Sequence, residues 1–241
     1  MLKLDNICLN FEGREILHNM NLELKAGERI ALMGPSGRGK TSLLRIIAGL
    51  QKPSSGKVEN HFHAISFMFQ EPRLLPWLTA WENVNLLLSD SEKTKEQAMD
   101  LLCSFDLCAD GDKYPHELSG GMQQRVALSR ALAVNADLYL MDEPFKAMDE
   151  KLRFDSIERS SRLVGDAAVL LVTHDIREAE AMNCKIINIY KRLGNNPKSY
   201  FIAYFSKSSA LISSKTLKSF GSVCSPMNFS IHTMPYQRPN L

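Results

Sequence analysis

The sequence lacks the long apolar run that a membrane-spanning helix requires. No stretch approaches the roughly 20 consecutive apolar residues needed to cross a bilayer. The opening segment MLKLDNICLNF has neither the apolar stretch nor the cleavage site of a signal peptide, so we expect an edge strand there. Internal repeats and heptads are missing too, which argues against repeat and coiled-coil architectures.

The five cysteines form neither a C-x-x-C pair nor a zinc-like spacing. The pattern predicts reduced thiols of a cytosolic protein rather than a metal site or disulfides. The cysteines are Cys8, Cys103, Cys108, Cys184 and Cys224.

Acidic residues are missing from the last quarter of the chain. Residues 181–241 hold eight of the 29 basic residues and none of the 27 acidic ones. The preceding residues hold 21 basic and 27 acidic residues, although the whole chain has a net charge of +2. Residues 1–180 therefore lack the basic excess expected of a nucleic-acid binder.

What is present indicates a globular α/β protein. The 241 residues are 44% apolar and 23% charged, enough for one core with a smaller subdomain. The strand-like runs ERIALM, HAISFMF, LYLMD and AAVLLVT alternate with helical stretches, and residues 79–134 are mainly helical after a capping box from Thr79 to Glu82. This order predicts a mostly parallel sheet with ligands at the carboxyl ends of its strands.

A glycine-rich segment between a strand and a helix fits the pattern G-x-x-x-x-G-K-[ST]. Backbone N–H groups, the helix N-terminus and the lysine would hold phosphate oxygens, and the threonine hydroxyl would reach magnesium. A Gly/Ser-rich turn that binds nothing is the alternative, which this context disfavours. We therefore predict nucleoside triphosphate binding by Gly34, Pro35, Ser36, Gly37, Arg38, Gly39, Lys40, Thr41 and Ser42.

Polar residues follow three of the predicted strands. Asp142 ends LYLMD, where a carboxylate suits magnesium, and Glu143 is placed to act as general base for an attacking water. Gln70 and His174 end two other runs and are candidates for sensing the water or contacting the γ-phosphate. For each residue taken alone, a solvated loop position is the alternative interpretation.

Together these residues resemble the ATP-binding cassette (ABC) family, the ATPase subunits of ABC transporters. The resemblance runs from about Phe11 to about His174, and its most specific element is a variant of the family signature LSGGQ, with methionine in last place. It implies a P-loop NTPase fold with a mostly parallel central sheet and an antiparallel β subdomain, in a domain of residues 1–194. It also implies an inserted helical subdomain over about 71–133. The signature residues are Leu118, Ser119, Gly120, Gly121 and Met122.

The resemblance also implies a site shared between two chains. The signature residues Ser119, Gly120, Gly121 and Met122 would act on ATP held by the other subunit, in a head-to-tail dimer, most simply of identical chains. Glycines would be needed because side chains would block the partner's approach.

Individual roles carry over by position. Phe11 matches the aromatic that stacks on adenine, although a strand core position is the alternative. Asp149 matches a dimer-contact aspartate and His174 the switch histidine. Catalysis is assigned to Glu143, His174 and Gln70. Magnesium is assigned to Thr41, Gln70 and Asp142.

Two residues depart from the family pattern. Met122 replaces the usual glutamine, which we expect to be tolerated because that side chain is not a phosphate ligand. Lys146 stands where the family usually has a small residue, and a bulky cation there could loosen or retune the dimer contact of Asp149.

The stretch from Leu74 to Val84 resembles the LLPW-x-T-x-x-ENV segment of nitrate, sulfonate and taurine importer ATPases, a group that includes importers of a thiamine-precursor pyrimidine. It implies a membrane permease as partner, indirectly a solute-binding protein, and a place on the cytoplasmic face of the inner membrane. Leu75, Pro76 and Trp77 would anchor the permease, unless Trp77 and Trp81 pack the helical subdomain. No nucleic acid is expected.

Residues 195–241 no longer resemble the family and form a divergent, basic, serine-rich tail. The tail is either a basic extension near anionic lipids or an altered C-terminus without function. For the whole chain, the alternatives to an importer ATPase are a non-transport ABC ATPase, a regulatory cassette with little turnover, and an exporter.

Overall fold

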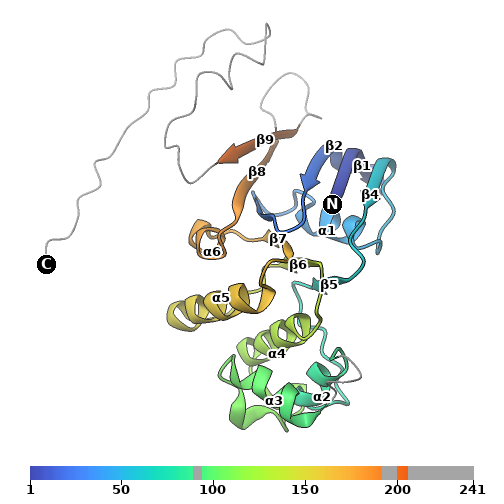
Figure 1. Ribbon diagram of the computed structural model, residues 1–241. Coiled ribbons are helices and arrows are strands. Elements are labelled where there is room, and N and C mark those ends of the chain that lie inside the picture. The colour runs from blue at the N-terminus through green and yellow to red at the C-terminus, as the bar shows by residue number, and fades with distance from the viewer. Residues whose placement is uncertain (89–93, 192–199, 206–241) are drawn as a thin grey trace, which may run out of the picture. The chain divides into compact units, whose positions relative to one another are not determined.

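The structure is a computed structural model that describes residues 1–88, 94–191 and 200–205. Figure 1 shows two sheets and a group of helices, α2 to α4, that pack against one another. The strands are β1 (Leu2–Phe11), β2 (Arg14–Leu24), β3 (Arg29–Met33), β4 (Ser55–Asn60), β5 (Ile65–Met68), β6 (Leu138–Asp142), β7 (Ala168–Val172), β8 (Lys185–Lys191) and β9 (Tyr200–Phe205). The helices are α1 (Lys40–Ile47), α2 (Ala80–Asn85), α3 (Lys95–Cys103), α4 (Gly120–Leu132), α5 (Glu150–Val164) and α6 (Ile176–Ala181), with short 3₁₀ turns η1 (Cys108–Asp110) and η2 (Pro115–Glu117).

The larger sheet has the order β5-β6-β7-β3-β8-β9, and all of its pairs are parallel except β8 with β9. Its central strands are short apolar runs that are buried on both faces, as is usual for parallel sheets covered by helices. Successive side chains alternate between the faces, so Leu138 and Leu140 enter one core whereas Tyr139 and Met141 enter another. The sheet thus separates two hydrophobic cores.

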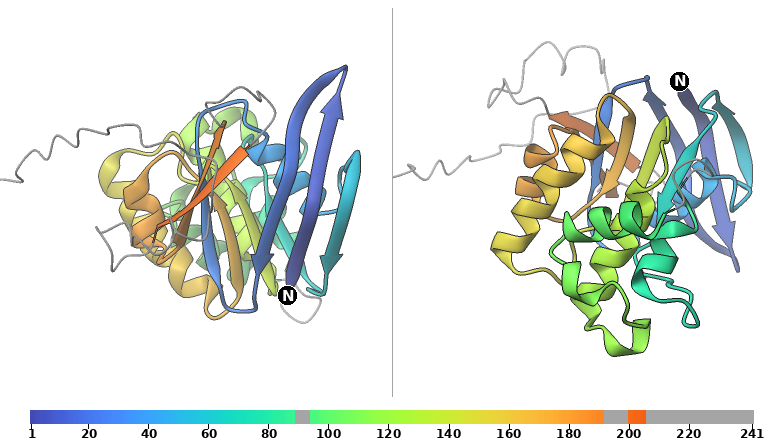
Figure 2. Two further views of the ribbon diagram at one scale, coloured as in Figure 1. Left: turned by 90° about the horizontal axis from the view of Figure 1, so that it is seen from above. Right: turned by 60° about the horizontal axis from the view of Figure 1, so that its bottom comes forward.

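Helix α1 fills the space between the two sheets. Leu43, Leu44, Ile46 and Ile47 are buried in one core cluster with residues of β1, β2, β3, β6 and β7. The view from above in Figure 2 shows the blue strands of the antiparallel sheet, order β2-β1-β4, as a separate layer. This packing fixes the first turn of α1 beside the end of β3.

Helices α4, α5 and α6 cover the opposite face of the larger sheet. Ala127, Leu128, Ile157 and Ala179 of these helices share a buried cluster with Val169 and other residues of the sheet. The amino-terminal part of α4 also joins a third cluster, which forms the core of the helical subdomain with α2 and α3. Helix α4 therefore connects the helical subdomain to the sheet.

The capping box predicted at the start of the helical region is present. The side chain of Thr79 accepts from the backbone N–H of Glu82, and the Glu82 carboxylate accepts from the backbone N–H of Thr79. The predicted fold class, a P-loop NTPase with a mostly parallel sheet, an antiparallel sheet and a helical subdomain, is confirmed.

The expectation that the opening segment is an edge strand is wrong. β1 is the central strand of its sheet, with β2 on one side and β4 on the other. The pairing with β4 joins segments about 50 residues apart, for example Leu2 with Asn60. A pairing at this separation leaves no signal in the local sequence pattern.

The expectation of reduced thiols is wrong for two cysteines. Cys103 at the end of α3 and Cys108 at the start of η1 form a disulfide, with their Cα atoms 4.3 Å apart. The chain turns back between them, since the N–H of Leu107 donates to the carbonyl of Leu102. A spacing of five residues matches no standard motif and so gives no signal for a disulfide. Within the described residues, Cys8 and Cys184 form no disulfide, and Cys224 lies outside those residues.

Part of the divergent tail forms a strand. β9 pairs antiparallel with β8, from Ile186 with Phe205 to Lys191 with Tyr200. The run YFIAYF is rich in aromatic and β-branched residues, a feature that the serine-rich composition of the whole tail obscures. The rest of the predicted tail lies outside the described residues, and the domain boundary at residue 194 stays a prediction. Within the described ranges, no helix has the length and apolar character of a membrane span.

The packing of α1 generates a stability prediction. Leu44 is fully buried between the two sheets, so we expect Leu44→Ala to lower the free energy of unfolding by about 2–5 kcal/mol. Leu50→Ala, at a leucine that is 59% exposed, is the matched control and should stay within about 0.5 kcal/mol of the starting protein. Urea unfolding of both variants measures the difference, and equal losses would contradict the assigned core.

Candidate nucleotide-binding site

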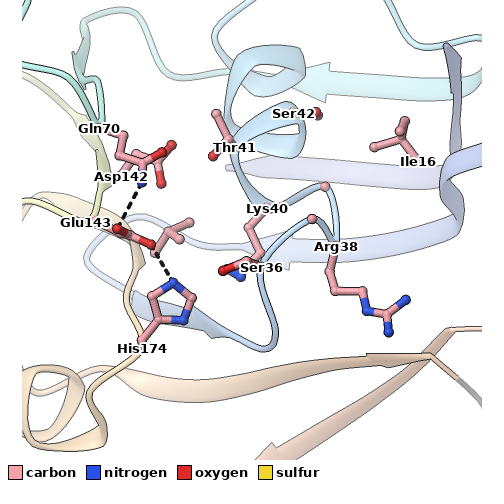
Figure 3. Close-up of a pocket in the computed structure, with 13 residues that line it drawn as sticks. Ile16, Ser36, Arg38, Lys40, Thr41, Ser42, Gln70, Asp142, Glu143 and His174 are labelled. Carbon is pink, nitrogen blue, oxygen red and sulfur yellow. Dashed lines mark hydrogen bonds and ion pairs between the residues drawn. The ribbon is translucent and has the colours of Figure 1, made fainter. Parts of the chain in front are cut away.

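A cavity of about 280 Å³ opens where β3, β6 and β7 end. The parallel register brings these ends together. Val172 of β7 pairs with Leu32 of β3 on one side and with Asp142 of β6 on the other. Figure 3 shows the loop before α1 facing the residues that follow β6 and β7. The predicted residues that line the cavity are Ser36, Gly37, Arg38, Gly39, Lys40, Thr41, Ser42, Gln70, Asp142, Glu143 and His174.

The glycine-rich loop has the conformation that its sequence requires. Gly39 caps α1 with a φ of 77°, a left-handed conformation that favours glycine. A Cβ at this position would lie 2.6 Å from the side chain of Leu17, so a larger residue would also collide with β2. The loop therefore turns sharply into α1 and directs the start of this helix at the cavity.

Lys40 is folded back on its own loop. Its side chain is buried, and Nζ donates to the carbonyls of Gly34 at 2.7 Å and Pro35 at 2.9 Å. Burial lowers the pKa of this ammonium, although the charges of Glu143 and Asp142 oppose the shift. Gly34 and Pro35 thus contact the lysine with their carbonyls. Phosphate oxygens would be stronger acceptors for the same ammonium.

Asp142 has the properties of a cation ligand. It ends β6 and is 2% exposed, and burial raises the pKa of its carboxyl while a hydrogen bond from Thr41 lowers it. Within the described residues, Oδ2 has no hydrogen-bond partner. A buried carboxylate oxygen without a donor, beside a threonine hydroxyl, fits magnesium, which takes few protein oxygens and completes its shell with phosphate and water.

Glu143 lies at the centre of a polar cluster. Its Oε1 is 2.5 Å from Nε2 of His174, and its Oε2 accepts from Nε2 of Gln70 at 3.0 Å (Figure 3). Nζ of Lys146 lies 3.2 Å from the same Oε2. The cluster thus brings together three residues predicted to be catalytic, from the ends of β5, β6 and β7, and adds a lysine.

The charge of Glu143 is stabilised by these neighbours. Burial favours the neutral acid, but the hydrogen bond from Lys146 and the charge of His174 outweigh it, so the pKa of Glu143 lies below its ordinary value. The carboxylate is therefore ionised near neutral pH. An ionised carboxylate is the form that accepts a proton from water.

The signature residues begin α4. Ser119 is the N-cap, and its side chain accepts from the backbone N–H of Met122 at 3.3 Å. Met122 packs against the core of the helical subdomain, consistent with a side chain that binds no phosphate. No described atom lies within 4 Å of the position of a Cβ on Gly120, so this glycine borders open space.

Gly121 is constrained within the chain itself. A Cβ there would lie 2.8 Å from the carbonyl oxygen of Ala147, on the loop that follows Glu143. On the next turn of α4, Nε2 of Gln124 donates to the carbonyls of Glu143 and Pro144, both at 3.4 Å. The helix that carries the signature therefore packs directly on the loop that carries Glu143, a contact that the sequence pattern did not reveal.

Arg153 joins two other site segments. Its guanidinium donates to the carbonyl of Met148 at 3.3 Å and lies 3.5 Å from Asp175, next to His174. Asp149 caps α5 by accepting from the N–H of Leu152, and Asp175 caps α6. No sequence motif indicates Gln124 or Arg153, because their partners are backbone carbonyls or residues distant in sequence. The apolar residues Ile16 and Val172, which also line the cavity, have no sequence signal either.

Other predicted residues lie apart from the cavity. Phe11 is 60% exposed at the end of β1, outside the cavity lining, so its contact with adenine stays a prediction. Trp77 is 68% exposed, so it stays a candidate anchor for the permease. Trp81 instead packs on the core of the helical subdomain. Arg125 and Arg130 donate to backbone carbonyls, at Phe105 and Pro72 among others, in structural roles.

Comparison with known proteins identifies the family. A profile of the ABC transporter family matches residues 17–146. The chain belongs to this family. An aliphatic sulfonates import ATP-binding protein of Pseudomonas syringae is 39% identical over 186 residues, which cover 76% of this chain and 80% of that protein. A probable sulfate/thiosulfate import ATP-binding protein of Chlorella vulgaris is 38% identical over 228 residues, covering 84% and 97%.

Solved structures lead to the same family. A dimeric ATP-binding cassette in a post-hydrolysis state, bound to ADP and Pi, superposes with a TM-score of 0.70 at 35% identity, covering 78% of this chain and 94% of that one. The resemblance to importer ABC ATPases that the motifs indicated is confirmed.

The two signature glycines generate a matched test. We expect Gly121→Ala to lower the free energy of unfolding by about 1–3 kcal/mol, because the new methyl group collides with the carbonyl of Ala147. Gly120→Ala should leave stability within about 0.5 kcal/mol, since its methyl group would meet no described atom. Denaturant unfolding measures both, and a stable Gly121→Ala variant would show that the contact yields easily.

Proposed function

We propose that this chain is the ATP-hydrolysing subunit of an ABC importer. The observation that carries the proposal is the cluster in which the ionised Glu143 contacts Gln70 and His174, across the cavity from Lys40. A phosphate loop alone indicates nucleotide binding. The Glu143 carboxylate, on the side of the cavity opposite Lys40, adds a base that could activate water for hydrolysis of the nucleotide.

Each residue has a distinct part in the reaction. Lys40 exchanges its two carbonyl partners for phosphate oxygens, and the backbone N–H groups at the start of α1 add donors. Glu143 accepts a proton from the water that attacks the γ-phosphate, while Gln70 and His174 orient this water and the phosphate. Thr41, Gln70 and Asp142 would hold Mg²⁺, which neutralises phosphate charge when bound.

The proposed site is completed by a second ATPase subunit, most simply an identical chain. Ser119, Gly120 and the N-terminus of α4 offer a hydroxyl, open space and a positive dipole to the γ-phosphate of the partner's ATP. Asp149 contributes to the contact between subunits. The related cassette bound to ADP and Pi is itself dimeric, which supports this arrangement.

A separate membrane permease is the proposed transport partner. Trp77 is exposed beside Leu74 and Leu75, and it offers an apolar anchor after Gln70. Relatives named for aliphatic sulfonates and sulfate support an oxyanion or sulfonate as solute, delivered through a solute-binding protein. We place the chain on the cytoplasmic face of the inner membrane.

ATP turnover tests the proposal. We expect the purified chain to hydrolyse ATP with Mg²⁺, and Glu143→Gln to lower kcat by at least about 100-fold because no carboxylate remains to accept the proton. The variant should still bind ATP and form a dimer, which light scattering detects. Glu158→Gln, on the exposed side of α5, is the control and should retain turnover. Retained turnover in Glu143→Gln would contradict the assignment of the base.

Magnesium binding has its own test in the inactive Glu143→Gln background. We expect Mg²⁺ to increase the shift in melting temperature that ATP produces, because the cation links Asp142 and Thr41 to phosphate. Adding Asp142→Asn should remove the increment from Mg²⁺ while preserving a shift with ATP alone. An increment that survives this substitution would assign the cation to other ligands.

A further inference from the structure

Lys146 lies three residues after Glu143, on the loop that follows β6. Its side chain is 60% exposed, yet Nζ lies 3.2 Å from Oε2 of Glu143 rather than extending into solvent. This chain therefore adds a cation to the carboxylate that the proposed reaction uses as its base.

We propose that Lys146 is a positioning residue that holds the Glu143 carboxylate at the catalytic site. This inference rests on the proposed function, because the value of the contact depends on Glu143 acting as the base. It predicts a role for a residue outside the family's catalytic set.

The loop backbone fixes Lys146 beside Glu143. Glu143 has a φ of 49° and Ala147 a φ of 64°, both left-handed, and the N–H of Lys146 donates to the carbonyl of Glu143 at 3.3 Å. This turn places the two side chains together. The contacts from Gly121 and Gln124 of α4 hold the same backbone, so the pair is built into the loop rather than formed by chance between mobile chains.

The two carboxylate oxygens have different partners. Oε1 is contacted by His174, whereas Oε2 is shared by Gln70 and Lys146. Gln70 and His174 come from segments after β5 and β7, and both are expected to turn toward water and phosphate when ATP binds. Lys146 belongs to the same loop as Glu143, so it retains the carboxylate while the other two change partners.

The charges around Glu143 explain why an added cation has an effect. The acidic groups of Asp142 and Glu178 oppose the negative charge of the Glu143 carboxylate. The nearby ammonium of Lys40 already donates to carbonyls of the glycine-rich loop. Lys146 balances the acidic neighbours from the solvent side. The titratable groups that face Glu143 are Lys40, Asp142, Lys146, His174 and Glu178.

A contact at this exposure has a modest strength. Half-exposed ion pairs are screened by water, so we expect loss of the lysine to lower kcat by about two- to fivefold rather than to abolish turnover. The KM for ATP should stay unchanged, because Lys146 does not line the cavity. This split between kcat and KM separates positioning of the base from binding of the nucleotide.

Turnover of two substitutions provides the first test. Lys146→Met keeps the length of the side chain without its charge and should show the loss in kcat, whereas Lys146→Arg should recover most of it. Lys151→Met, at an exposed lysine of α5, is the matched control and should behave like the unmodified chain. An equal loss in the arginine variant, a rise in kcat or a change confined to KM would overturn the proposal.

Unfolding provides a second test that does not need turnover. We expect Lys146→Met to lower the melting temperature by about 1–2 °C in the unmodified chain and to have no effect when Glu143→Gln is also present. Additive effects would show that the two side chains do not interact and would overturn the proposal. The unmodified chain could bind ATP without hydrolysing it while Lys146→Met and Glu143→Gln still have non-additive effects on melting temperature. That result would contradict the proposed function but would support the contact between Lys146 and Glu143.

Discussion

The register of three parallel strands, β3, β6 and β7, is the constraint on which the rest of the molecule depends. Each strand is a short apolar run, and alternation of its side chains supplies both cores at once. The pairing of Asp142 with Val172, and of Leu32 with Val172, ends the strands at one edge. The glycine-rich loop, the acidic pair Asp142 and Glu143, and His174 follow the strands at that edge. A slip of one residue would exchange the two cores and separate these groups.

The polar groups of the site contact one another. Lys40 is bound by carbonyls of its own loop, and Glu143 is bound by Gln70, His174 and Lys146. Most of these contacts are charge-assisted, which makes them stronger than hydrogen bonds between neutral groups. The exception is Oδ2 of Asp142, which lacks a partner among the described residues and matches the ligand chemistry of a cation.

Much of the site was predictable because its chemistry is contiguous in sequence. The phosphate loop and the segment LYLMDEP each contain their own strand, turn and polar residues, so local patterns locate them. The contact of Gly121 with Ala147 and the position of β1 were not predictable, because both depend on segments that meet only in three dimensions. Lys146 is an intermediate case. Its presence was evident, but its pairing with Glu143 depends on left-handed backbone at Glu143 and Ala147, which neither residue type favours.

The close approach of Gly121 to Ala147 links the two roles that one chain has in a pair of active sites. The start of α4 faces a partner's nucleotide in the proposed dimer, whereas the loop with Ala147 carries the chain's own base. The helix and the loop approach each other at backbone level, and Gln124 bonds across the same contact. In the proposed dimer, a displacement of α4 by the partner's nucleotide would therefore move the loop that carries Glu143 and couple the two nucleotide sites.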